Sequence, residues 1–172
     1  MKRTRFLKPV NCLVYICFLA FAMVLFSTLS IAQTPTNFSG KWAFDRSKSD
    51  PGKGSSFMYN DLIRNIIQNP ASISIEEIVR SPGGEVVSDT QKFSLDGKET
   101  IEKTDMGTTK RIAKWSEDKK ILTLTTIMLI DSSDYRGDSS YKLSGDGLIM
   151  TIQSEFKNPN GESTVIEVFN KK

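Results

Sequence analysis

The chain has 172 residues, of which 23 are lysine or arginine, 20 are aspartate or glutamate, 2 are cysteine and none is histidine. Catalysis by Ser-His-Asp or Cys-His groups and zinc sites that use histidine are excluded, because the required base or ligand is missing. We therefore predict no catalytic residues, no metal site and no cofactor, and we expect that the protein is not an enzyme.

Residues 1–32 have the three parts of a secretory signal, which are a basic start, an apolar stretch and a small-residue cleavage site. The apolar stretch covers residues 13–26, and small side chains precede Gln33. We predict a helical signal peptide that is cleaved after Ala32, so that the protein is periplasmic or extracellular. The alternative is an uncleaved membrane anchor at residues 13–32, which approaches the ~20 residues that a spanning helix needs. Either alternative exports the remainder of the chain.

Residues 33–172 form one predicted domain whose composition differs from that of the whole chain. Both cysteines and four of the 23 basic residues lie before residue 33, which leaves 19 basic residues against 20 acidic ones. Without cysteine the domain has no disulfide. A nearly neutral domain also lacks the clustered positive charge that binds phosphates, so we predict no nucleic-acid partner.

The first predicted strand covers residues 38–44, because Trp42 and Phe44 alternate with smaller or polar neighbours. Residues 57–68 are ambiguous between helix and strand. Leu62, Ile63, Ile66 and Ile67 fit one face of a helix, whereas the alternation from Leu62 to Gln68 fits a strand.

From residue 72 onward, runs of β-prone residues alternate with turn signals such as Asp96-Gly97. Glu76 and Glu77 are neighbours on one of these runs, so they point to opposite faces and do not form a carboxylate pair. We predict a loop at residues 131–138 and strands at residues 72–80, 85–95, 98–103, 108–115, 121–130, 141–144, 148–156 and 164–169.

Short strands joined by hairpin-length turns pair with their neighbours in the sequence. We predict an all-β fold, an antiparallel up-and-down meander of about 8–10 strands that closes into a barrel and so removes its exposed edges.

Three features resemble small secreted bacterial lipocalin-like proteins, which have a calycin-type β-barrel: the segment 37–42 (NFSGKW), the segment 48–52 (KSDPG) and the repeated Pro-x-Gly-Glu and Asp-Gly hairpins. The resemblance covers the layout of nearly all of residues 33–172, and Gly40 and Trp42 are its most specific match. It implies a lipocalin-like barrel in which Trp42 packs across the closed end and the open mouth receives a small apolar ligand. No arginine is available near the C-terminus to lie over Trp42, only Lys171 and Lys172.

Six aromatic residues on predicted strands are the candidate ligand-binding residues: Trp42, Phe44, Phe93, Trp115, Tyr141 and Phe156. They either fill the barrel or line a cavity, because eight-stranded barrels do both. The first hypothesis is an exported binding protein that holds a small hydrophobic ligand. The second is a non-enzymatic structural or interaction domain with a filled barrel, and an enzyme that uses only carboxylates, serine, tyrosine and lysine is the third. We expect a monomer that contacts a membrane only if the N-terminal segment is retained.

Overall fold

The computed structural model describes residues 33–53, 55–59, 61–81, 83–104, 107–130 and 133–172. The chain divides into two units, Met1–Gln33 and Thr34–Lys172, and only the second is described below. The predicted signal helix lies outside the described residues. Within them, no helix is both long enough and apolar enough to cross a membrane.

The described part of the chain forms one sheet of ten antiparallel strands in the order β4-β3-β2-β1-β10-β9-β8-β7-β6-β5. Every neighbouring pair is consecutive in the sequence except β1 and β10, which join the two ends of the meander. The strands are β1 (Gly40–Phe44), β2 (Asp61–Gln68), β3 (Ser72–Arg80), β4 (Val86–Ser94), β5 (Thr100–Thr104), β6 (Gly107–Trp115), β7 (Ile121–Ile130), β8 (Ser133–Leu143), β9 (Ile149–Asn158) and β10 (Gly161–Lys171). This arrangement confirms the predicted all-β meander.

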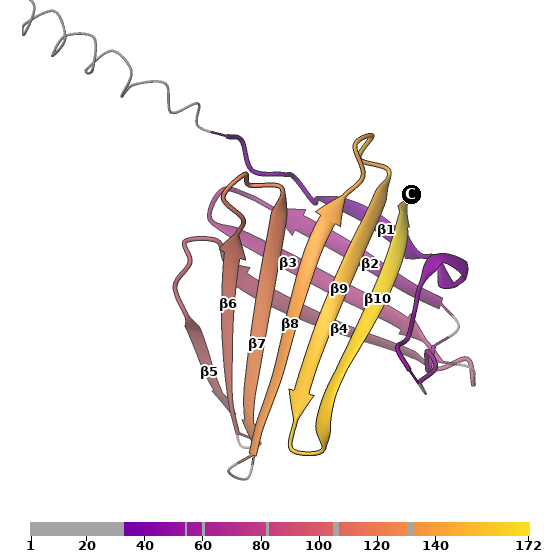
Figure 1. Cartoon of the computed structure of the whole chain (residues 1–172), viewed down its shortest axis with the longest axis vertical. Helices are drawn as coiled ribbons and strands as arrows, with labels where there is room; N and C mark the ends of the chain where they lie inside the picture. The colour runs from indigo at the N-terminus through magenta and orange to yellow at the C-terminus, as the bar shows by residue number, and fades with distance from the viewer. Residues whose placement is uncertain (1–32, 54, 60, 82, 105–106, 131–132) are drawn as a thin grey trace, which may run out of the picture. The chain divides into compact units, whose positions relative to one another are not determined.

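The sheet curls into a nearly closed barrel. In Figure 1, β5 to β10 form the near wall and β2 to β4 cross behind them at a steep angle. The edge strands β4 and β5 are the two ends of the ladder, and β4 lies against β6 across the seam between them. A short 3-10 helix, η1 (Arg46–Lys48), follows β1, and the chain then runs along β10 through a bridge between Asp50 and Ile166.

Of the ambiguous residues 57–68, those from Asp61 to Gln68 form a strand. Along β2, Leu62, Arg64 and Ile66 are buried, whereas Ile67 is 72% exposed. Residue Arg64 lies opposite Trp42 of β1 on one side and opposite Glu77 of β3 on the other. The strand alternative is therefore correct. The sequence fits a helix and a strand equally well, and the hydrogen bonding of β2 to β1 and β3 decides for the strand.

The predicted loop at residues 131–138 is wrong for its described part, which belongs to β8. Residue Arg136 lies opposite Ile127 of β7 and Lys157 of β9. The side chain of Asp138 accepts hydrogen bonds from Thr125 and Arg136. The strand is polar because half of it faces solvent, and pairing with two long neighbours overrides its low β propensity.

One end of the barrel is filled by side chains. Phe38, Trp42 and Phe169 are each 0% exposed. The Trp42 indole donates a hydrogen bond of 2.9 Å to the Phe38 carbonyl oxygen, and the Phe38 ring stacks on Trp115 at 6.1 Å between centroids. The ammonium group of Lys171 lies 5.2 Å from the centre of the Trp42 ring, so a lysine occupies the position for which no arginine was available.

Three hairpin turns share one Ser-x-Asp structure. After β4, β6 and β8, a serine hydroxyl donates to the carboxylate two residues later, at 2.8, 2.6 and 2.5 Å. The same carboxylate accepts a backbone N–H from two residues further on. The three pairs are Ser94–Asp96, Ser116–Asp118 and Ser144–Asp146. Each carboxylate thus adds side-chain hydrogen bonds to its turn, and in two of the turns a backbone N–H also bonds across, from Lys119 to Ser116 and from Gly147 to Ser144.

Candidate ligand-binding cavity

The other half of the barrel contains a cavity of about 720 Å³. Residues of eight of the strands line it, together with residues of the segment between β1 and β2, among them Phe57 and Tyr59. The lining is mixed, with aromatic and aliphatic side chains beside hydroxyl groups, guanidinium groups and carboxylates. Of the two barrels that the sequence allowed, the structure therefore shows the hollow one.

Small inward-facing residues create this space. One row across the near wall consists of Ala113, Leu124, Ser139, Ser154 and Val165, each opposite the next. The adjacent row toward the filled end consists of Trp115, Leu122, Tyr141, Ile152 and Glu167. Bulky side chains in the second row fill the barrel, and serine and alanine in the first leave room.

The six aromatic residues singled out from the sequence divide between the two halves. Phe93, Tyr141 and Phe156 line the cavity. Trp42, Phe44 and Trp115 belong to the packed core of the filled end or lie against it. Contact between any of the six and a ligand stays a prediction.

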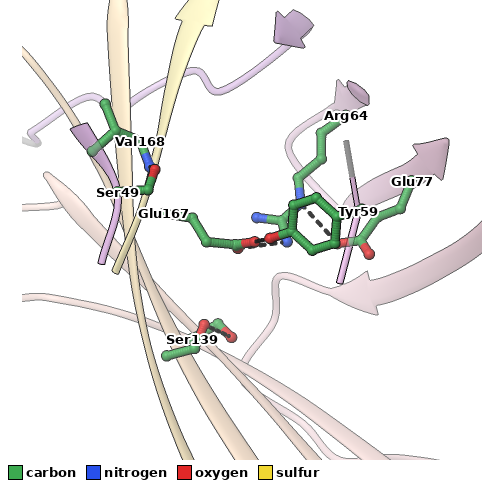
Figure 2. A network of polar contacts seen from close by, with 8 residues as sticks. Ser49, Tyr59, Arg64, Glu77, Ser139, Glu167 and Val168 are labelled. Atoms are coloured by element: carbon green, nitrogen blue, oxygen red, sulfur yellow. Dashed lines mark hydrogen bonds and ion pairs between the residues drawn. The ribbon is translucent and has the colours of Figure 1, made fainter. Parts of the chain in front are cut away.

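A buried cluster of charged and polar side chains forms one wall of the cavity. The Arg64 guanidinium donates from Nε to Glu77 at 2.7 Å and from Nη2 to Glu167 at 2.8 Å. The Tyr59 hydroxyl donates to the other oxygen of Glu167 at 2.6 Å. Figure 2 shows Glu167 meeting Tyr59 and Arg64 from one side, while Glu77 meets Arg64 from the other.

The strand register builds this cluster. Glu77 lies directly opposite Arg64 on the neighbouring strand, where cross-strand side chains are close enough to pair. Glu167 comes from β10, and Tyr59 from the segment that precedes β2. The Arg64 guanidinium also lies 4.7 Å from the centre of the Phe169 ring, which anchors it on the filled end by a cation–π contact.

Burial and neighbouring charges shift the pKa values of two tyrosine side chains at this wall. Burial raises the pKa of Tyr59 far above its ordinary value, and the Glu167 carboxylate beside it adds to the shift. Burial also raises the pKa of Tyr141 to about 12, against the opposing effect of Arg64. Both phenols are therefore neutral at physiological pH and act as hydrogen-bond donors or acceptors.

Three polar groups of the lining have no partner among the residues that the structure describes. Arg64 Nη1 and Arg111 Nε are buried without a hydrogen bond. The Tyr141 hydroxyl makes no hydrogen bond either, although its residue is only 5% exposed. Because a buried donor without a partner is costly, the two arginine nitrogens are natural contacts for a polar atom of a ligand, and the Tyr141 hydroxyl lines the cavity beside Arg64 as a further hydrogen-bonding group.

Sequence reasoning missed Arg64, Glu77, Glu167 and Tyr59 as members of one site. It placed Glu76 and Glu77 correctly on opposite faces: Glu76 bonds Asn65 at 2.8 Å, and Glu77 bonds Arg64. The available signal was a charged residue at an inward position of an alternating strand, as in Leu62-Arg64-Ile66. Partners from distant strands cannot be found from that signal without the register.

Among the described residues, no group of three or more histidine, cysteine, aspartate or glutamate side chains could hold a metal ion.

The comparisons with known proteins are sparse. No family model matches the chain, and no curated protein matches it. Among solved structures, the chain is similar to a crystal structure of zebrafish ileal bile acid-binding protein complexed with cholic acid. That match has 19% sequence identity and a TM-score of 0.48, and it covers 80% of this chain and 100% of the other. Membership of a lipocalin-like family stays a prediction.

Proposed function

We propose that the domain binds a small, largely apolar molecule inside the barrel. The observation that carries this proposal is the cavity of about 720 Å³, which is closed at one end by packed aromatic residues. Its volume lies in the range of about 300–1,000 Å³ that is typical of small-molecule sites. Phe93, Leu124 and Phe156 supply apolar contact area, and the Arg64 cluster supplies a few fixed polar groups.

The test uses N-phenyl-1-naphthylamine, an uncharged probe whose fluorescence rises in apolar surroundings. We expect the full chain to bind it, and we expect Ser139→Phe to weaken binding by at least about tenfold, because the added ring occupies the cavity. Ser140→Phe is the matched control. Ser140 lies next in the chain but on the opposite face, where its hydroxyl pairs with Thr123 at 3.1 Å.

A retained thermal transition would show that both variants fold. If the wild type does not bind the probe, or if both phenylalanine variants bind it as the wild type does, the barrel works without an internal ligand. The remaining function would then be that of a structural or interaction domain that uses its surface.

The site of action is a second part of the proposal: the domain works outside the cytoplasm. The support is the basic, apolar and small-residue pattern of residues 1–32, which lie outside the described residues. The intact mass of protein isolated from its own host tests it. A chain that starts at Gln33 indicates a cleaved signal peptide, a membrane-bound full-length chain indicates the anchor, and a full-length chain in the cytoplasm contradicts export.

A further inference from the structure

We propose that the cavity prefers an uncharged amphipathic molecule, with a hydroxyl, carbonyl or amide group at its polar end, over the corresponding carboxylate. This inference rests on the proposed binding function and adds the chemical class of the ligand. It is carried by the charges around Arg64 and by the polar groups beside it that have no partner.

The charged wall of the cavity carries an excess of negative charge. Arg64 contributes one positive charge, and Glu77 and Glu167 contribute two negative charges, all within hydrogen-bonding distance. Burial opposes the charge on Arg64, but the Glu167 and Glu77 carboxylates beside it stabilise that charge, and the pKa of the guanidinium is raised. A ligand carboxylate at this wall would lose its hydration and meet an arginine whose charge is already compensated.

The other cations of the lining are compensated as well. Arg111 pairs with Glu102 at 2.7 Å, Arg136 with Asp138 at 2.6 Å and Lys157 with Glu162 at 2.6 Å. Asp89 also lines the cavity and has no ion pair within the part of the chain that the structure describes. In those residues the lining therefore offers no lysine or arginine that lacks a carboxylate partner.

Hydrogen-bonding groups without a partner among the described residues remain at the charged wall and beside it. The Tyr141 hydroxyl has no hydrogen-bond partner within the described ranges, and it is both a donor and an acceptor because it is neutral. Arg64 Nη1 is a buried donor without an acceptor. A hydroxyl, carbonyl or amide oxygen satisfies such donors without bringing a charge into the cavity, while its apolar tail contacts Phe93, Leu124 and Phe156.

The experiment compares three ligands that share one chain length and differ in the polar end: decan-1-ol, decanamide and decanoate. Each displaces bound N-phenyl-1-naphthylamine from the full chain at pH 8, where decanoate is ionised. We expect the alcohol and the amide to displace the probe at concentrations at least about tenfold lower than decanoate.

Two variants at neighbouring positions test whether the preference for uncharged ligands arises from the charge that faces the cavity. Glu77→Gln removes one inward negative charge and keeps an oxygen that accepts from Arg64, so decanoate should gain several-fold relative to decan-1-ol. Glu76→Gln makes the same chemical change on the outward face, where Glu76 bonds Asn65, and it should leave the ratio unchanged. If Glu77→Gln does not fold, the ratio measured on the wild type still decides the proposal.

The outcomes separate the two proposals. Decanoate binding as tightly as decan-1-ol, or equal changes in the two variants, would overturn the preference for uncharged ligands and leave cavity binding intact. Failure of all three ligands and of the probe to bind would overturn the binding function and the preference with it.

Discussion

The two halves of the barrel are built from the same strands but are stabilised in different ways. The filled half contains Trp42, Phe38 and Phe169, which are completely buried and pack on one another. The hollow half has a mixed lining of apolar and polar side chains, and ion pairs and hydrogen bonds around Arg64 join its strands. Close packing stabilises through area and dispersion, whereas a buried ion pair contributes little net stability but is costly to break. The filled half therefore supplies stability, and the hollow half supplies a shaped and polar interior.

The variant with the largest expected effect on stability tests the contribution of the Arg64 cluster to the hollow half. Arg64→Met should lower the free energy of unfolding by about 4 kcal/mol, because it leaves two partly buried carboxylates without their cation. Denaturant unfolding at pH 8 measures this loss.

Arg136→Met is the control for this experiment. The Arg136–Asp138 pair has side chains that are 49% and 28% exposed, so its loss should cost at most about 1 kcal/mol. Equal losses for Arg64→Met and Arg136→Met would contradict the view that the Arg64 cluster holds the hollow half.

The next effect compares the two halves on a single strand. Leu122 and Leu124 face inward at successive positions of β7, but only Leu124 lines the cavity. We expect Leu122→Ala to cost about 3 kcal/mol and Leu124→Ala about 2 kcal/mol, because a side chain beside an existing space loses fewer contacts. Unfolding curves of the two variants provide the test. A greater loss for Leu124→Ala would mean that both halves are packed alike.

The smallest effect concerns the surface turns. The Ser144 hydroxyl and the Leu148 N–H hold the pKa of Asp146 below its ordinary value of 3.8. A carboxylate with a lowered pKa in the folded state stabilises the protein above its ordinary pKa, and this contribution is lost as the pH falls through the folded value. Asp146→Asn should therefore lower the melting temperature slightly at pH 7 and leave it unchanged at strongly acid pH. A loss that is equal at both pH values would contradict a role for the charge.

Much of the fold could be predicted because each strand carries its own signal. The alternation at residues 72–80 and the β-branched run at residues 121–130 match β3 and β7 in their bounds. Asp96-Gly97 marks the turn between β4 and β5. Such signals are local, and the meander follows from them because consecutive strands pair.

The parts that could not be predicted depend on contacts between distant residues. β8 begins at Ser133 because β7 and β9 pair with it, although its own sequence is typical of a loop. The aromatic residues were placed on strands correctly, but Trp115 and Tyr141 lie in one row of the sheet, and only the packing of the folded barrel decides that Tyr141 lines the cavity and Trp115 does not. Arg64 and Glu167 are 103 residues apart in the sequence, so no local pattern reveals that they belong to one cluster.

The seam between β4 and β5 has a consequence for the motion of the barrel. Each of these strands is hydrogen-bonded on one side only, and Val86, Val87 and Ile101 along them are 53, 55 and 53% exposed. Backbone amides at such an edge exchange with solvent deuterium sooner than those of β9, which is paired on both sides. We therefore expect local opening to begin at the seam, where β4 carries the cavity-lining residues Asp89, Gln91 and Phe93. We expect amide exchange to be slowest in the aromatic core around Trp42, which is completely buried.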